Sequence, residues 1–391
     1  VRVSVGRDPR LSGEELAQAL MGGLVSGEGG CDVGDAGLST TPIMFMACIN
    51  EDYDFNGGVM ITASHLPSHR NGFKFFTDKG GLGKQDISEV LSFAAKQYGD
   101  GEFEVTPPRD DRCQKLSLLE TYKQSIKDMI CEQVRRESPN ERSPLHGVAV
   151  IVNAGNGSGG FLVDALRQVG ASTQGSLHLE PDGTFPNHLA NPELPEAMEP
   201  TIAAVLENKA DLGIVLDTDV DSSGVVDKNG VAINRNRLIA FLATVVLRDH
   251  PGTTIVTDST TSNGLKKFIE ARGGKHLRFK KGYKNVIDKA IELNEEGVDY
   301  QLAIEISGHG AFKENNMQND GAYMALKVLV ELARNKWGGK REVELGDAIK
   351  DLAEPMESTE FRLRVSNTVE PTDMYAKTLD AARVSGIIST G

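Results

Sequence analysis

Short apolar runs alternate with amphipathic segments along this chain of 391 residues. The run VRVSV at residues 1–5 is followed by LSGEELAQALMGGL, in which a leucine recurs every four residues from Leu16 to Leu24. Ser12 and Glu15 stand at the spacing of a capping box, which marks the start of a helix. This pattern predicts a strand that leads into an amphipathic helix.

The same order of strand and helix returns further along the chain, in GVAVIV before GGFLVDALRQVG, in ADLGIVLD, and in TTIVTD before NGLKKFIEARG. Repeated strand-helix units predict mainly parallel sheets with helices on their faces. Two polar stretches, RRESPNERSPLHG and RDHPGT, separate three such blocks. We therefore expect an α/β fold with three similar domains at 1–143, 144–250 and 251–366, and a remnant of a linker or of another domain at 367–391.

Composition and charge exclude several classes of protein. Apolar residues make up 39% and charged residues 25% of the chain, and no apolar run approaches the roughly 20 residues that a membrane helix needs. A net charge of -14 repels phosphate backbones, so nucleic acid is not an expected partner. The four cysteines form no CxxC pair and are sparse, which favours reduced thiols inside a cell.

Three aspartates, Asp217, Asp219 and Asp221, follow the apolar run LGIVL at every second position. In extended backbone this period places all three on one side, where they can bind one hard cation. An EF-hand is excluded, because Ser222 stands in place of its glycine and Lys228 in place of its last glutamate. We expect a magnesium site here; the alternative is a solvated acidic turn.

The stretch ITASHLPSHRNGFKFF places Ser64 just after an apolar run, where open α/β sheets bind their ligands. His65 and His69 are four residues apart, but Pro67 prevents a regular helix between them, which disfavours zinc. With Lys74 nearby and a magnesium site elsewhere in the chain, the serine indicates phosphoryl transfer. The alternative is an ordinary turn serine.

A third stretch, AIEISGHGAFKENN, holds Glu305, Ser307, His309 and Lys313 after another apolar run. A glutamate and a serine on one short loop can bind neighbouring hydroxyl groups, such as those of a sugar. We therefore expect these four residues to bind substrate.

A competing motif lies in NAGNGSGGF, where Gly155, Gly157 and Gly160 match GxGxxG between a predicted strand and helix. Glu180 follows at the sequence separation expected of the acidic residue that binds the ribose of a dinucleotide. A dinucleotide-dependent oxidoreductase is therefore an alternative function, and a tight structural turn is the simpler explanation of these glycines.

The stretches TASHLPSHRNGFKFF, LDTDVD and EISGHGAFK, in this order, resemble the three signature loops of the α-D-phosphohexomutase family. VGRDPRLSG resembles the GRDxR stretch of that family's first domain. The resemblance covers about residues 1 to 366 and is closest to the phosphomannomutase/phosphoglucomutase type. It implies three related α/β domains and a smaller fourth around a central cleft.

The resemblance also implies roles for residues of the first loop. Ser64 would be the serine that carries the phosphate, with His65 beside it, and Lys74 would take part in proton transfer. Arg7 and Arg10 would support this loop electrostatically.

The same resemblance implies roles for residues of the second and third loops. Asp217, Asp219 and Asp221 would hold Mg²⁺ together with a phosphate oxygen on Ser64. Glu305 and Ser307, in the loop that also holds His309 and Lys313, would bind the sugar hydroxyls.

The implied activity is that of an isomerase, an intramolecular phosphotransferase. It would move phosphate between the C1 and C6 hydroxyls of a hexose phosphate through phospho-Ser64 and a bound hexose 1,6-bisphosphate, which also acts as the activator. Glucose and mannose phosphates are the expected substrates, a monomer or homodimer the expected assembly, and the cytoplasm or the plastid stroma the expected location.

The chain departs from the family pattern at several positions. Leu66 stands where asparagine is expected, Ser222 where arginine is expected, and Ile304 where glycine is expected. RVSNTVEPTDMY, at 364–375, only faintly echoes the family's RxSGTEP phosphate clamp, so the fourth domain is expected to be missing or truncated. The chain also begins at Val1 inside a strand pattern, like a fragment, and a non-catalytic sugar-phosphate-binding paralogue remains an alternative.

Overall fold

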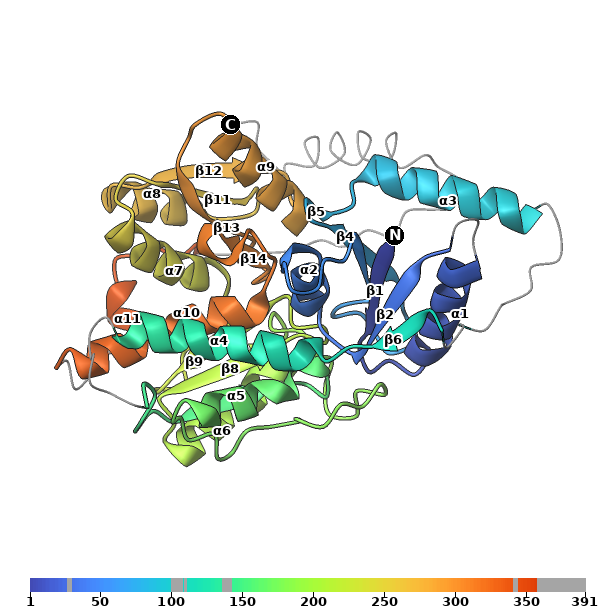
Figure 1. Ribbon diagram of the computed structural model, residues 1–391. Coiled ribbons are helices and arrows are strands. Elements are labelled where there is room, and N and C mark those ends of the chain that lie inside the picture. Colours follow the sequence, from blue (N-terminus) through green and yellow to red (C-terminus); the bar gives the residue numbers. More distant parts are fainter. Residues whose placement is uncertain (27–29, 100–107, 109–110, 136–142, 340–343, 357–391) are drawn as a thin grey trace, which may run out of the picture. The chain divides into compact units, whose positions relative to one another are not determined.

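The computed structural model describes residues 1–26, 30–99, 108, 111–135, 143–339 and 344–356 (Figure 1). The chain divides into a compact body at Val1–Glu354 and a second body at Pro355–Gly391. The predicted boundary at 366, the stretch that echoes the phosphate clamp and the remnant at 367–391 all lie outside the described residues. The following description therefore concerns the body at Val1–Glu354.

The first sheet has six strands in the order β5-β4-β3-β1-β2-β6. Strands β1, β2, β3 and β6 run parallel, and β4 and β5 are antiparallel additions at one edge. Side chains alternate between the two faces, so that Ile61 packs under α1 and its neighbour Met60 packs under α2. The strands are β1 (Arg2–Arg7), β2 (Asp32–Leu38), β3 (Gly57–Ile61), β4 (Phe73–Thr77), β5 (Gly80–Gly81) and β6 (Cys113–Lys115). The helices of this region are α1 (Gly13–Ser26), α2 (Thr41–Ile49), α3 (Lys84–Gly99) and α4 (Leu118–Arg135).

The second sheet has four strands in the order β10-β9-β8-β7, of which β7 and β8 are parallel. Its neighbouring residues again separate the two faces: Ile151 packs against α6, and Val150 and Val152 belong to the large core on the other side. The strands are β7 (Val150–Asn153), β8 (Leu212–Leu216), β9 (Ser223–Asp227) and β10 (Ala232–Ile233). The helices are η1 (Ser158–Phe161), α5 (Leu162–Gln168), α6 (Pro195–Asn208) and α7 (Arg235–Asp249).

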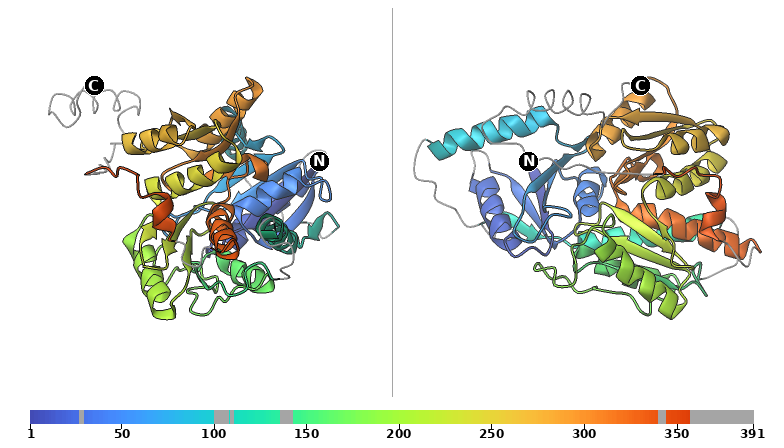
Figure 2. Two further views of the ribbon diagram at one scale, coloured as in Figure 1. Left: turned by 90° about the vertical axis from the view of Figure 1, so that its left-hand side faces the viewer. Right: turned by 180° about the vertical axis from the view of Figure 1, so that it is seen from behind.

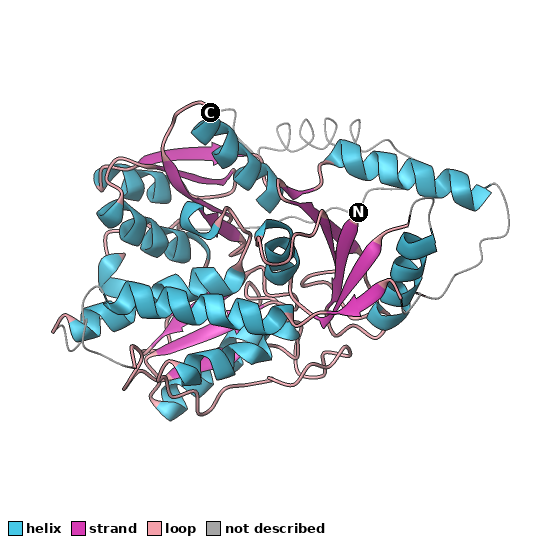
Figure 3. Cartoon of the chain, in the orientation of Figure 1, coloured by secondary structure: helices cyan, strands magenta, loops and turns pink. Residues whose placement is uncertain are grey.

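The third sheet has the order β12-β11-β13-β14, with β11 parallel to both β12 and β13 and with β14 antiparallel at the edge. Helix α9 covers one face, over Val256 and Ala303. The strands are β11 (Thr254–Asp258), β12 (Lys275–Phe279), β13 (Tyr300–Ile304) and β14 (Gly310–Phe312). The helices are α8 (Asn263–Ala271), α9 (Tyr283–Glu295), η2 (Lys313–Asn315), α10 (Gly321–Trp337) and α11 (Leu345–Ala348). Figure 3 distinguishes these helices and strands, and Figure 2 shows them from the side and from behind.

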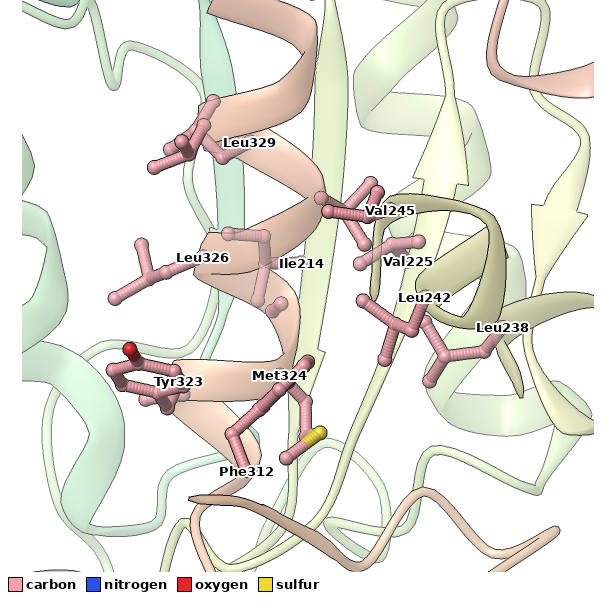
Figure 4. Packing of buried hydrophobic residues seen from close by; sticks show 14 of the residues in the cluster. Ile214, Val225, Leu238, Leu242, Val245, Phe312, Tyr323, Met324, Leu326 and Leu329 are labelled. Atoms are coloured by element: carbon pink, nitrogen blue, oxygen red, sulfur yellow. The ribbon is translucent and has the colours of Figure 1, made fainter. Parts of the chain in front are cut away.

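The prediction of three α/β units with mixed sheets is confirmed. Pairing is mainly parallel in the first and third sheets, whereas in the second only β7 and β8 are parallel. The cores of the three units are not separate, however. Helix α4 packs against α2, α5 and α10, and α10 in turn packs on β8, β9 and α7. Figure 4 shows Tyr323, Leu326 and Leu329 on one side of α10, and Val225 of β9 with Leu242 and Val245 of α7 on its other side. One apolar cluster therefore joins all three units, although the linkers in the sequence suggest independent blocks.

The start of α1 differs in detail from the predicted capping box. The Ser12 hydroxyl accepts a hydrogen bond from Asn71 Nδ2 at 3.0 Å, and the Ser12 carbonyl accepts one from the Leu16 amide. Ser12 therefore links the helix start to the loop that follows β3. Within the described part of the chain, no helix has both the length and the apolar character that crossing a bilayer requires.

Replacing Leu326 by alanine should destabilise the protein, because this side chain is fully buried in the shared core. Leu→Ala changes at such sites typically cost about 2–5 kcal/mol of unfolding free energy. The matched control is Leu206→Ala on α6, where the side chain is 52% exposed and the expected change is about 0.5 kcal/mol or less. Urea denaturation of both variants measures the difference, and equal losses would contradict the shared core.

Candidate active site

The loop after β3 holds Ser64 in an uncommon backbone conformation. Its φ is +51°, in the left-handed region that residues other than glycine seldom adopt. The Ser64 amide donates to Thr62 Oγ1 at 2.9 Å, and the Thr62 hydroxyl in turn donates to Asp8 Oδ2 at 2.7 Å. This local network aims the serine at the edge of the sheet where the sequence predicts a ligand site.

A buried guanidinium supports the same loop from below. Arg10 is 1% exposed, and its two terminal nitrogens donate to the carbonyls of four loop residues, Ser64, Leu66, Pro67 and Arg70. Its Nε pairs with Asp8 Oδ2 at 3.0 Å. Through these contacts Arg10 lies against the serine loop. Arg7 does not join it, because its guanidinium pairs with Glu14 of α1 and lies partly exposed.

The three aspartates converge, but through a turn and not through extended backbone. All three side chains are fully buried. The chain leaves β8 at Leu216 and turns at Val220, whose φ is +67°, and the Val220 amide donates to the Asp217 carbonyl at 3.3 Å. The prediction that period two in a strand aligns the carboxylates was therefore wrong in its geometry: a tight turn brings together residues that a strand would space along one face.

The serine meets this loop at Asp217. Ser64 Oγ donates to Asp217 Oδ2 at 3.1 Å and lies 3.3 Å from Nδ1 of His65. Burial, reinforced by the neighbouring Asp219 and Asp221, raises the pKa of Asp217 well above its usual value. Three carboxylates in one buried loop therefore repel one another, and the loop needs positive charge.

Lys74 supplies part of that charge from β4. Its Nζ lies 2.6 Å from Asp219 Oδ2 and 2.7 Å from Asp221 Oδ2. Burial alone would lower the pKa of this lysine, but the two aspartates outweigh it and raise the pKa well above the usual value. The ammonium group is therefore charged and shared between two carboxylates.

His309 supplies the second positive group. Its Nε2 lies 3.1 Å from Asp221 Oδ1, and its Nδ1 lies 2.9 Å from Ser307 Oγ. Burial opposes protonation, yet Asp221 raises the pKa of His309 to about 9. The Tyr283 ring stacks on the imidazole with centroids 5.6 Å apart and an interplanar angle of 14°. His309 thus lies at the acidic loop as well as in the predicted sugar loop.

The carboxylate oxygens fit a hard cation. Ligand atoms of Asp217, Asp221 and His309 lie within 4.8 Å of one another. Asp219 Oδ1 is buried without a hydrogen-bond partner, as expected of an oxygen that a cation would satisfy. The aspartates supply oxygen ligands, which favour Mg²⁺, whereas Nε2 of His309 lies 3.1 Å from Asp221 Oδ1.

The remaining predicted residues of the third loop divide into two groups. Glu305 is buried, and its Oε1 accepts a hydrogen bond from the Gly282 amide at 2.5 Å; burial raises its pKa. Ser307 lies beside His309. Lys313 lies apart from them, because its Nζ donates to Asn294 Oδ1 at 2.7 Å and faces the Tyr300 ring.

His65, predicted beside the serine, lies close to the third loop. Its ring centroid is 6.4 Å from that of His309, and burial lowers its pKa. Two positions that depart from the family pattern lie in different surroundings. The Leu66 side chain is 47% exposed, whereas Ser222 is buried and its backbone pairs with that of His309 in an isolated antiparallel β-bridge.

Sequence reasoning missed two polar residues that contact the acidic loop and a tyrosine that covers His309. Thr41 Oγ1 donates to Asp219 Oδ2 at 2.5 Å, and Asn319 Nδ2 donates to Asp221 Oδ2 at 2.9 Å. Tyr283, already described, covers His309. Thr41 follows β2 at the same sheet edge as Ser64, and that position was a usable signal. Asn319 and Tyr283 carry no motif of their own.

The glycines of the GxGxxG match are explained by the protein's own packing. A Cβ at Gly157 would lie 2.7 Å from backbone atoms of Thr218, and one at Gly160 would collide with the Leu179 carbonyl. Gly155 has a φ of +54°. In a dinucleotide fold the second glycine makes room for pyrophosphate, whereas here that space holds the chain itself. The geometry favours the structural turn over the oxidoreductase alternative.

Comparisons with known proteins agree with these loops. Three family models match in order: phosphoglucomutase/phosphomannomutase alpha/beta/alpha domain I at residues 1–98, domain II at 120–230 and domain III at 234–355. Among curated proteins, a phosphomannomutase/phosphoglucomutase of Pseudomonas putida is 33% identical over 86% of this chain and 66% of its own length. A phosphoglucomutase of Neisseria gonorrhoeae is 32% identical over 84% of this chain and 66% of its own.

Solved structures show the same relationship. A phosphoglucomutase/phosphomannomutase family protein of Burkholderia thailandensis is similar with a TM-score of 0.73 and 28% identity, over 90% of this chain and 71% of that protein. The chain spans 66% of the length of the curated relatives. With all three family models matched in order, the chain belongs to the phosphoglucomutase/phosphomannomutase family of α-D-phosphohexomutases.

Proposed function

We propose that this chain carries the phosphoryl-transfer centre of a Mg²⁺-dependent hexose-phosphate mutase. Such an isomerase moves phosphate between the C1 and C6 hydroxyls of glucose or mannose phosphates. The observation that carries the proposal is the hydrogen bond of 3.1 Å from Ser64 Oγ to Asp217 in a loop with two more buried carboxylates. The names of the relatives support the same reaction.

The exchange would run through the serine. The Ser64 oxygen takes a phosphoryl group from bound hexose 1,6-bisphosphate: the Oγ–P bond forms, the P–O bond to the sugar breaks, and the hydroxyl proton passes to the released sugar oxygen. Return of the phosphoryl group to the other sugar hydroxyl completes the isomerisation. The bisphosphate would also act as the activator, because it loads the serine before the first turnover.

We infer the roles of the remaining residues from the family resemblance together with their contacts. Arg10 would hold the serine loop in place through its four carbonyl contacts. Asp217, Asp219 and Asp221 would hold Mg²⁺, which, when bound, neutralises carboxylates and draws charge from a phosphoryl group. Lys74, shared between two aspartates, would be the fixed counter-charge for the dianionic phosphoserine. Glu305 and Ser307 would bind sugar hydroxyls, with His309 between them and the acidic loop.

Incubation with glucose 1,6-bisphosphate and Mg²⁺ should add one phosphoryl group to the chain, measured by intact mass. Ser64→Ala should abolish the gain, and so should a chelator. The matched control is Ser68→Ala in the same loop, which should keep it. A gain that survives in Ser64→Ala would reject this serine as the nucleophile.

Substitutions of Lys74 should separate a charge role from a proton-transfer role. Loss of one preorganised charge typically slows such a reaction by about 10²–10³-fold, so Lys74→Met should slow phosphorylation of Ser64 by about that factor. Lys74→Arg should restore most of the rate, because the geometry supports a charge role and a guanidinium keeps its charge. An equally slow Lys74→Arg would instead favour proton transfer, since a guanidinium does not release its proton. Single-turnover rates from rapid-quench mass spectrometry distinguish the two.

Asp217→Asn should stabilise the metal-free protein and remove the stabilisation that Mg²⁺ gives the parent. The raised pKa of Asp217 means that its ionised form is disfavoured in the folded protein, so a neutral amide should raise the melting temperature in metal-free buffer. Added Mg²⁺ should raise the melting temperature of the parent protein and not that of the variant. Asp164→Asn on α5, whose side chain is 63% exposed, is the control that should respond as the parent does. An unchanged Mg²⁺ response in Asp217→Asn would contradict the proposed metal site.

A further inference from the structure

Helix α3 carries apolar side chains that the rest of the described structure does not cover. None of its 16 residues is buried. Most helices in proteins are stabilised by the packing of an apolar face on a neighbouring element and not by helix propensity alone. Figures 1 and 2 show α3 along the outer side of the first α/β unit. A helix of this length with no packed face needs a partner.

The apolar residues of α3 form one stripe along the helix. They recur at the helical spacing i, i+3, i+4, i+7 and i+11, at Ile87, Val90, Leu91, Ala94 and Tyr98. Val90 is 42%, Leu91 63% and Tyr98 80% exposed. Such a stripe is typical of a helix that packs against another element along its whole length.

The charged residues near this stripe are divided between the two halves of the helix. Asp86 and Glu89 lie in the first half, and Lys96 lies in the last turn. Within the described residues, none of these three forms an ion pair. Two copies of α3 packed antiparallel would bring the acidic half of each copy against Lys96 of the other, whereas parallel packing would bring like charges together.

The antiparallel register that aligns opposite charges also aligns apolar side chains with apolar side chains. In this register the facing residues of the two copies are Glu89 with Lys96, Leu91 with Ala94, and Ile87 with Tyr98. A twofold axis between the helices repeats each pairing, as in any interface in which two copies use the same surface. The stripe is therefore complementary to itself in both shape and charge.

A membrane surface fits this helix less well. Helices that lie on membranes carry an excess of lysine and arginine on their polar face. Helix α3 has two acidic and two basic residues, and the whole chain has a net charge of -14. That net charge also makes two copies repel each other, but at about 0.15 M salt charges more than about 8 Å apart are largely screened.

We propose that α3 is the interface of a homodimer, in which it packs antiparallel against α3 of a second copy. Leu91 and Ala94 lie beside the twofold axis, and a pair of Glu89 with Lys96 lies on each side of it. One pair of helices buries less than the roughly 1,200–2,000 Å² of a standard interface, so the dimer dissociates on dilution. No residue of the interface belongs to the proposed phosphoryl-transfer centre, and dimerisation does not require that activity.

Sedimentation velocity of the 391-residue chain over a range of concentrations measures the dissociation constant of the dimer. Leu91→Glu should raise this constant at least about tenfold, because it places an unpaired charge in the apolar stripe of both copies. The matched control is Ser92→Glu, which adds the same charge one residue further, outside the stripe, and should leave the constant unchanged.

Exchange of the charges tests the antiparallel register. Lys96→Glu should raise the dissociation constant about fivefold, because it replaces two ion pairs by two contacts between like charges. The double variant with Glu89→Lys and Lys96→Glu should restore the constant of the parent, since both ion pairs form again with their signs reversed. A double variant that dimerises as weakly as Lys96→Glu would overturn the proposal.

Two further results would also overturn it. A parent chain that stays monomeric at about 100 μM, far above a micromolar dissociation constant, has no such dimer; if Leu91→Glu then lowers its melting temperature, another part of the same chain covers the stripe. A dimer that Leu91→Glu leaves intact uses a different surface. Ser64→Ala should dimerise as the parent does, so the outcome is independent of the mutase proposal.

Discussion

The strongest constraint on this molecule is the burial of three carboxylates in one loop. Asp217, Asp219 and Asp221 are fully buried, and the contacts around them supply two positive groups, Lys74 and His309. Buried charges are tolerated only when opposite charges and hydrogen bonds compensate them. Lys74 and His309 offset two of the three carboxylates, and burial disfavours the ionised form of the third, Asp217, so a further cation bound at the loop would favour that ionised form.

That constraint reaches all three sheets, because each supplies something to the acidic loop. Lys74 comes from β4 of the first sheet, the aspartates follow β8 of the second, and His309 precedes β14 of the third. Ser64 and the acidic loop each follow the carboxyl end of a strand, where open α/β sheets place their ligands. The shared apolar core keeps these strand ends together. The packing between the three α/β units therefore also determines the geometry of the site.

The sequence allowed prediction of those parts that local pattern determines. Strand-helix alternation predicted the α/β class, and the positions of Ser64 and Asp217 just after apolar runs predicted that each would follow a strand. The sequence did not allow prediction of side-chain contacts between residues that are far apart in the chain. Arg7 and Arg10 stand in the same motif, yet only Arg10 turns under the serine loop, because its guanidinium finds four carbonyls there. Lys313 follows the sugar loop in sequence but turns away from it toward Asn294.

The turn at the aspartates shows why such details escape a one-dimensional pattern. Its shape depends on backbone contacts with distant segments: the Gly321 amide donates to the Val220 carbonyl at 3.0 Å, and the Thr41 amide donates to the Asp219 carbonyl at 2.9 Å. A Cβ at Gly321 would collide with the Ser222 backbone, and one at Gly308 would collide with the Ser223 carbonyl. Because Gly308 and Gly321 have no side chain, the third α/β unit can pack directly against the acidic loop of the second unit. Because backbone meets backbone there, the loop that holds His309 packs directly against the loop that holds the three aspartates.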